Sequence, residues 1–213
     1  GDRGETGQES LYPLTDPAVS YPALLYDGPF SDAAGQTEYR ALAGLPAVDA
    51  AGAERALRAY LGAGAVTELR LEGESSIPVD CYEFSVTANG YSMSAGVTKA
   101  GAQVLYMLPN EDVTDVTLTD AQGVEAARAF LAARGYGEMH ESYFSRYDGI
   151  PTVNFAAVQD DVVLYPDLVK VQVSLRDGAV IGLEAGGYLR NHVARDLTLP
   201  ALSQEEAVAR LGG

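Results

Sequence analysis

One stretch, LTDAQGVEAARAFL at residues 118–131, shows most directly how this chain folds. Thr119 and Gln122 have the spacing of a capping box, in which each side chain accepts a hydrogen bond from the backbone N–H of the other residue and so closes the start of a helix. Apolar residues then follow at the spacing of one helical face, and Gly135 stands where the helix would stop. The stretch therefore predicts a short amphipathic helix with a defined start and end.

The same pattern occurs twice more along the chain. An earlier copy, VDAAGAERALRAYLG at residues 48–62, has Asp49 as its cap and apolar residues on one helical face. A truncated copy, LSQEEAV at residues 202–208, has a second capping box formed by Ser203 and Glu206. The number of residues between the start of one copy and the start of the next is about the length of one small domain. The repetition therefore predicts tandem small units.

Strand signals follow each of the first two helices. In residues 82–86 and 168–175, apolar and polar side chains alternate with the two-residue period of a half-buried strand. Because a helix of this length is marginal in water by itself, it must pack on the strands. We therefore predict an α+β fold of tandem units, each a helix packed on one face of an antiparallel β-sheet. Four sequences supply the tight turns of the hairpins: Asn89-Gly90, Lys99-Ala100-Gly101, Asp148-Gly149 and Asp177-Gly178.

These signals divide the chain into four parts. They are an N-terminal extended arm at residues 1–46, a first unit at 47–109, a second unit at 110–192, and a connector with the start of a truncated third unit at 193–213. The chain begins with Gly1 and ends soon after the third helix begins, so we expect it to be a piece of a longer protein.

Composition argues against several classes of function. The formal net charge is −16, from 30 acidic and 14 basic residues, which repels nucleic-acid phosphates and anionic membrane surfaces. We expect no nucleic-acid partner. One cysteine, Cys81, and two histidines are too few for a disulfide framework or for most zinc sites, and we expect no cofactor and no metal. Cys81 lies in an apolar strand context, which favours a buried, inert thiol over the alternative of a reactive nucleophile.

Motifs for catalysis are weak. GYSMS at residues 90–94 lacks the second glycine of a nucleophile elbow, and a strand, not a helix, is predicted after it. Carboxylate pairs suited to glycoside hydrolysis cannot be selected among 30 acidic residues. A group of acids near the start of the second unit suggests either a calcium site or, as we favour, a solvated connector with one acid in the first turn of the helix. These acids are Glu111, Asp112, Asp115 and Asp120.

Aromatic residues beside prolines form the remaining signal. Residues 21–31 predict an extended strand followed by a turn, and residues 165–168 have a similar composition. Two interpretations stay open: the aromatic side chains pack in the core, or they form a rim that meets a protein partner. The candidate partner-binding residues are Tyr26, Asp27, Phe30, Tyr165, Asp167 and Tyr188.

Several stretches of the chain resemble the YpeB family of spore germination proteins. Among them are YPALLYDGPFS at residues 21–31, SYFSRYDGI at 142–150, YPDLVKV at 165–171 and GGYLRNH at 186–192. The resemblance implies a run of PepSY-type units, each a helix packed on an antiparallel sheet. This agrees with the fold that the periodicity predicts.

The resemblance also implies a function. It implies a non-enzymatic protein that is anchored to the spore inner membrane by an N-terminal helix, which we expect to lie outside this sequence, and that acts on the outer side of that membrane. The implied partner is a SleB-type cortex-lytic enzyme, a peptidoglycan hydrolase that the family stabilises and restrains. No catalytic residues carry over, so we expect no enzymatic activity. The alternative is a cell-wall ligand binder or a wall-active enzyme in its own right.

Overall fold

The computed structural model describes residues 38–194 of the chain. Three candidate residues, Tyr26, Asp27 and Phe30, lie outside the described residues, as does the truncated helix at 202–208. In chain order, the described elements are η1 (Arg40–Leu42), α1 (Ala50–Leu61), β1 (Val66–Ser75), β2 (Cys81–Ala88), β3 (Tyr91–Thr98), β4 (Val104–Pro109), α2 (Asp120–Ala133), β5 (Met139–Tyr147), β6 (Ile150–Gln159), β7 (Val162–Val173), β8 (Val180–Glu184) and α3 (Gly186–Asn191).

The two predicted helices within the described residues are confirmed, together with their caps. At the start of α1, the Asp49 carboxylate accepts a hydrogen bond from the Gly52 backbone N–H at 2.7 Å, and the helix ends at Gly62, whose φ is +94°. At the start of α2, the Thr119 N–H donates to the Gln122 side chain at 2.9 Å, and the Gln122 N–H donates to the Thr119 hydroxyl at 3.3 Å. Both bonds of the capping box are present, so the helix starts where the sequence predicts.

All four predicted turn sequences join neighbouring strands, as expected. A fifth turn, between β6 and β7, was not predicted. Its residues Asp160 and Asp161 have φ values of +50° and +62°, which aspartate adopts less readily than glycine. Three further elements were not predicted: β1, whose mixed sequence VTELRLEGES lacks a clean period, the six-residue helix α3, and η1, a short helical turn where the predicted arm was extended.

The eight strands form one continuous antiparallel sheet in the order β1-β2-β3-β4-β8-β7-β6-β5. The strands of the two predicted units are therefore joined edge to edge. The junction, which we call the seam, is the pairing of β4 with β8, where Tyr106 lies opposite Glu184 and Met107 lies opposite Leu183. After β4 the chain passes through α2 to the far edge of the sheet at β5, and it returns strand by strand to the seam.

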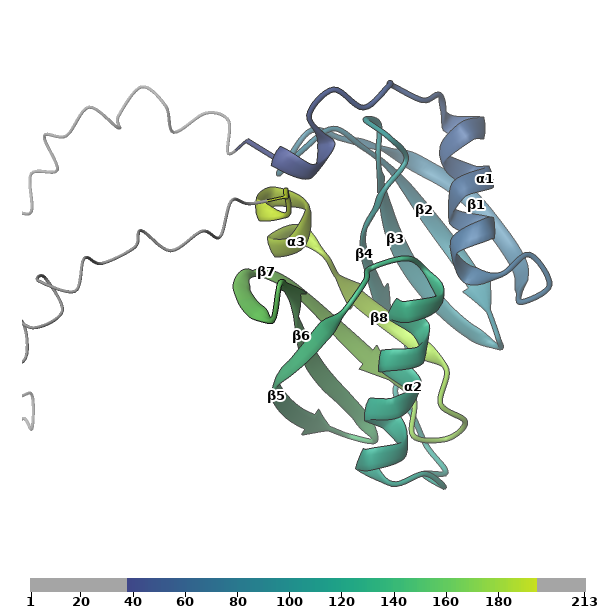
Figure 1. Ribbon diagram of the computed structural model, residues 1–213. Helices are drawn as coiled ribbons and strands as arrows, with labels where there is room; N and C mark the ends of the chain where they lie inside the picture. Colours follow the sequence, from purple (N-terminus) through teal and green to yellow (C-terminus); the bar gives the residue numbers. More distant parts are fainter. Residues whose placement is uncertain (1–37, 195–213) are drawn as a thin grey trace, which may run out of the picture. The chain divides into compact units, whose positions relative to one another are not determined.

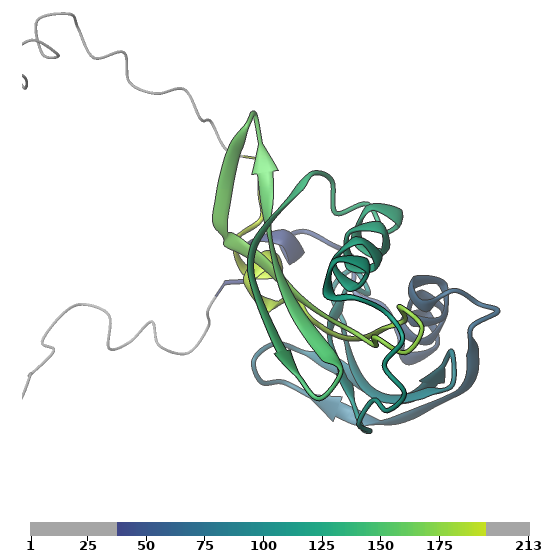
Figure 2. The same cartoon turned by 90° about the horizontal axis from the view of Figure 1, so that it is seen from below.

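Both helices cover the same face of this sheet, which curves around them (Figures 1 and 2). Residues directly opposite one another on paired strands share a face, so the register defines one row of side chains across the whole sheet. On the helix-covered face this row is Leu71, Phe84, Ala95, Met107, Leu183, Val171, Val153 and Phe144.

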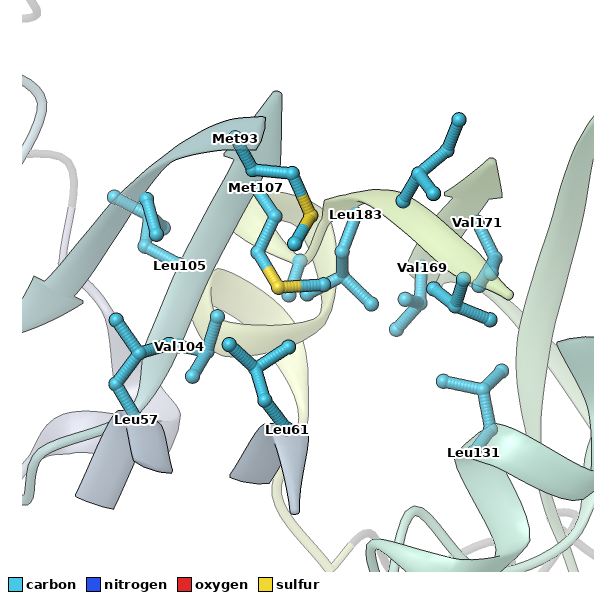
Figure 3. Packing of buried hydrophobic residues seen from close by; sticks show 14 of the residues in the cluster. Leu57, Leu61, Met93, Val104, Leu105, Met107, Leu131, Val169, Val171 and Leu183 are labelled. Carbon is cyan, nitrogen blue, oxygen red and sulfur yellow. The ribbon is translucent and has the colours of Figure 1, made fainter. Parts of the chain in front are cut away.

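The hydrophobic core continues through the seam without a break. Met107 and Leu183 lie side by side there, and Leu61 of α1 and Leu131 of α2 approach from either side (Figure 3). Met107 is 0% exposed and Leu183 is 2% exposed. The two units therefore share one core, although each has its own helix.

Candidate functional site

The face of the sheet opposite α1 and α2 is named the open face. The register places a second row of side chains on it, one from each strand: Gly73, Glu83, Gly96, Tyr106, Glu184, Lys170, Asn154 and Tyr143. Among these, the Tyr106 hydroxyl donates to Glu83, and Lys170 pairs with Glu184 at 3.4 Å. This row of the open face is therefore mostly polar, and it holds one ion pair and one tyrosine–carboxylate hydrogen bond across strands.

Two glycines make room for large side chains on the open face. A Cβ atom on Gly96 would overlap the Tyr106 ring, and one on Gly182 would overlap the Gln172 side-chain oxygen. Tyr106 and Gln172 therefore lie flat against the strand beside them. Burial and hydrogen bonding to the Glu83 carboxylate raise the pKa of Tyr106, so its phenol stays protonated and remains a donor.

A shallow hollow of about 190 Å³ lies on the open face over the seam. It is lined by Leu108, Thr152, Lys170, Gln172, Leu183 and Glu184. Leu108 is 51% exposed, and Tyr143 at the β5 edge of the same face is 62% exposed. An exposed leucine beside a hollow, framed by paired charges, has the composition of a protein-binding surface.

None of these open-face residues was among the predicted partner-binding residues. The signal was the run VLYMLP of β4, which is apolar on both sides instead of alternating. Such a run is typical of a strand in the middle of a sheet with both faces partly covered. It indicates a central strand, which β4 is because of the seam.

The three described candidate residues have different environments. Tyr165 in β7 is 62% exposed. Asp167, two residues later, is 0% exposed, and its carboxylate hydrogen-bonds the Nδ1 atom of His192 at 2.9 Å. Tyr188 in α3 is half-buried, stacks on the His192 ring with centroids 4.2 Å apart, and meets the edge of the Tyr136 ring at 5.1 Å. The structure thus brings Asp167 and Tyr188 together through His192, whereas Tyr165 stands apart on the surface.

Helix α3 holds this group in place because it lies directly on β7. A Cβ atom on Gly187 would be 3.1 Å from the Leu168 carbonyl oxygen, so glycine permits the close approach. The Asn191 side-chain amide donates to the Pro166 carbonyl at 3.0 Å. Asp167 is therefore a buried structural residue that positions α3, and it has no exposed surface to offer a partner.

Tyr188 also lines a cleft of about 190 Å³ between the C-terminal ends of α1 and α2, which we call the aromatic cleft. Its central side chain is Arg134, which donates from Nε to the Tyr60 carbonyl at 2.6 Å and from Nη1 to the Phe130 carbonyl at 2.9 Å. The guanidinium carbon is 3.3 Å from the centroid of the Phe130 ring. The hydroxyls of Tyr60 and Tyr136 hydrogen-bond each other at 3.0 Å, across the two units.

Burial controls protonation in the aromatic cleft. Desolvation raises the pKa of Tyr60 well above its ordinary value, and it also raises the pKa of Tyr136. Desolvation likewise raises the pKa of Tyr188 to about 12. The three phenols therefore stay protonated at neutral pH and above. The same desolvation lowers the pKa of Arg134, although an arginine remains charged.

A second polar contact joins the two units at the opposite end of the seam. The hydroxyl of Tyr91 in β3 donates to the Asp177 carboxylate at 2.9 Å and accepts from the Arg176 Nε atom at 2.9 Å. Ser174 lies 2.7 Å from the same hydroxyl. Because Tyr91 is 1% exposed, this network satisfies a phenol that burial would otherwise destabilise.

The other residues weighed for chemistry have structural surroundings. Cys81 is 1% exposed, and burial raises the pKa of its thiol to about 12, so the reactive thiolate is disfavoured. Of the acidic group, Glu111 accepts a hydrogen bond from the Ser92 N–H at 2.8 Å, and Asp120 pairs with Arg146 at 3.2 Å. Within residues 38–194, no three His, Cys, Asp or Glu side chains are placed to hold a metal ion.

Over the described range 38–194, no helix combines the length and hydropathy needed to cross a membrane.

Comparison with known proteins gives a consistent result. A family model described as YpeB sporulation, PepSY1 and PepSY2 domains, matches residues 9–198. Sporulation protein YpeB of Bacillus subtilis (strain 168) is 32% identical over 119 residues, covering 54% of this chain and 26% of that protein. Sporulation protein YpeB of Halalkalibacterium halodurans is 33% identical over 115 residues, with the same two shares. The matched region therefore spans about a quarter of the length of these curated relatives.

A solved structure supports the fold. The Bacillus megaterium YpeB C-terminal domain superposes with a TM-score of 0.64 at 24% sequence identity, covering 77% of this chain and 74% of that chain. The curated relatives are named as sporulation proteins, not as enzymes. The resemblance that the sequence motifs predicted is thus confirmed, and so is the α+β fold. The chain belongs to the YpeB sporulation family, and it carries that family's PepSY1 and PepSY2 domains.

Proposed function

We propose that this chain is a non-enzymatic spore germination module that binds a SleB-type cortex-lytic enzyme, stabilises it and restrains its activity on peptidoglycan. In this proposal the protein acts on the outer side of the spore inner membrane, and the open face is the surface that meets the hydrolase. Family membership supports a role in sporulation and germination. The observation that carries the proposal is the continuity of the open face across the seam.

The size of the open face suits a protein partner. Eight strands about 4.8 Å apart make the sheet about 34 Å wide, and strands of about six residues make it about 20 Å long. The resulting area is on the order of 700 Å², close to the roughly 800 Å² that each partner contributes to a standard protein interface. Neither unit alone offers that area, which gives a physical reason for joining the two sheets.

The first test is a mixing experiment. The purified chain and a SleB-type enzyme are combined at micromolar concentrations, complex formation is followed by light scattering, and muropeptide release from cortex peptidoglycan is measured. We expect a complex and slower release. Absence of any association at these concentrations would contradict the proposal. The chain alone should release no muropeptides, and release that a single carboxylate substitution abolishes would favour a wall-active enzyme instead.

The second test locates the surface. Leu108→Asp places a charge beside the hollow on the open face, and we expect it to weaken the complex at least about tenfold because an unpaired carboxylate would be desolvated in the interface. Leu71→Asp is the matched control, since Leu71 is 45% exposed and lies on the same sheet but on the helix-covered face. Equal binding by the two variants, with the fold intact by circular dichroism, would exclude the open face as the contact surface.

A further inference from the structure

Arg134 carries a charge that no acidic group of the described chain neutralises. Within residues 38–194 its hydrogen bonds go to two neutral backbone carbonyls, and its guanidinium lies over the neutral Phe130 ring. The protein as a whole has 30 acidic residues, so this lack of pairing is not caused by a shortage of carboxylates. A half-buried guanidinium gains most from a carboxylate that accepts two N–H bonds.

The phenols beside Arg134 offer a second donor. When the hydroxyls of Tyr60 and Tyr136 bond each other, one of them donates and the other keeps a proton that is available to a ligand. Both hydroxyls are protonated at neutral pH, as ordinary phenols are, and burial raises their pKa values further. The Arg134 guanidinium and a phenol O–H therefore line the same cleft as donors, and both suit an anion.

The size and remaining lining of the cleft restrict the ligand. A volume of about 190 Å³ is below the roughly 300 Å³ at which pockets begin to enclose drug-sized molecules, so only an end group can enter. One cation matches a monoanion better than a phosphate, and the strongly acidic protein repels polyanions. The rest of the wall includes the Tyr188 ring and the apolar side chains of Ala56, Ala102 and Val104.

We infer that the aromatic cleft, with Arg134 and the Tyr60–Tyr136 pair as donors, binds the carboxylate of a small apolar acid, such as the carboxyl terminus of a peptide that ends in an apolar residue. The carboxylate bonds the Arg134 guanidinium and one phenol, and the apolar group packs on Tyr188. This site lies on the helix side of the sheet, away from the open face, so it does not depend on the proposed hydrolase interface.

The test uses the whole chain, with N-acetyl-leucine as the probe and N-acetyl-leucinamide as its uncharged counterpart. Backbone amide NMR shifts of Gly135 and Ala102, which line the cleft, report binding. We expect saturable shifts with a Kd on the order of 1 mM for the acid and none for the amide. Acetate is a third probe that distinguishes the two possible sources of the carboxylate. If acetate binds as tightly as N-acetyl-leucine, the ligand is a free small carboxylate; if acetate binds more weakly, the ligand is the carboxyl terminus of a peptide.

Variants assign the site. Arg134→Gln should raise the Kd for N-acetyl-leucine about tenfold or more because a charge-assisted bond is lost. Arg146→Gln, which removes a surface arginine paired with Asp120, should leave the Kd unchanged. If Arg134→Gln unfolds the chain, Tyr60→Phe combined with Tyr136→Phe tests the same site, because the double variant removes both phenol donors and should weaken binding several-fold. No saturable shift up to about 10 mM acid, equal binding of the amide, or tighter binding of inorganic phosphate would overturn the inference.

Discussion

Single side chains in this protein are placed so that burial, and not a neighbouring catalytic group, determines their chemistry. Cys81 and Tyr91 are each 1% exposed, yet the thiol is left as an inert apolar group whereas the phenol is surrounded by Ser174, Arg176 and Asp177. A thiol is only weakly polar and tolerates burial without partners, but a phenol hydroxyl does not. Both groups keep their protons when folded, and this makes stability depend on pH.

Stability should fall above pH 9, with a measurable share due to Cys81. Its thiol pKa is about 12 in the folded chain and near 9 when unfolded, so at pH 9 to 12 the unfolded chain releases a proton that the folded chain retains. The free energy of unfolding attributable to Cys81 should then drop by up to about 1.4 kcal/mol per pH unit.

Urea unfolding of the parent and of Cys81→Ala at pH 8, 9, 10 and 11 measures this share. The small cavity in the variant costs the same at every pH, so the difference between the two proteins should shrink as pH rises. A difference that stays constant from pH 8 to pH 11 would show that the thiol does not titrate differently on folding.

The strands show how glycine allows bulky side chains to lie on the open face. Gly96 in β3 and Gly73 in β1 belong to the same cross-strand row, but only Gly96 lies under the Tyr106 ring. That ring cannot swing away freely because its hydroxyl is bonded to Glu83. Packing therefore requires glycine at position 96, whereas at position 73 there is open space where a Cβ atom would be.

Gly96→Ala should destabilise the protein by about 1–3 kcal/mol, because the new methyl group overlaps the Tyr106 ring. Gly73→Ala, the matched control, should be neutral or slightly stabilising, since alanine loses less backbone freedom on folding and meets no atom within 4 Å. Thermal unfolding of both variants compares the two positions directly. Equal melting temperatures would mean that Tyr106 moves aside at no cost.

The molecule as a whole is one folding unit within the described residues, although its sequence contains two similar halves. The halves are joined by the β4–β8 pairing, by the shared core around Met107 and Leu183, and by polar contacts at both ends of the seam. Interfaces this continuous unfold together, since separating them would expose both an apolar layer and the edges of two strands.

Tyr91→Phe tests this coupling because Tyr91 belongs to the first half and its hydroxyl partners belong to the second. Removing the hydroxyl leaves the buried Ser174 hydroxyl without this partner and breaks the hydrogen bond to Asp177, and it should cost about 1–3 kcal/mol. Hydrogen exchange followed by mass spectrometry should show a similar loss of protection in β2 and in β6. Tyr165→Phe, at an exposed position, is the control and should change neither strand.

The helices and hairpins were predictable because their causes act over a few residues. The Asp49 cap bonds a group three positions away, the Thr119 and Gln122 box spans the same distance, and turns such as Asn89-Gly90 form within the turn itself. Family motifs added the PepSY identity of the two units. None of these signals required knowledge of which strands become neighbours.

Two features, the open face and the aromatic cleft, could not be read in this way. Both depend on the pairing of β4 with β8, and on contacts such as the one between Tyr60 and Tyr136, which are 76 residues apart. The same is true of Asp167. It was a candidate for binding a partner, but in the folded structure it is buried and hydrogen-bonded to His192. Local hydrogen bonds form between chain neighbours whatever the rest of the chain does, so the sequence alone specified the helices and turns. Register and burial come from minimising exposed strand edges and apolar surface over the whole chain, so only the folded structure established one sheet, one core and the surfaces available for binding.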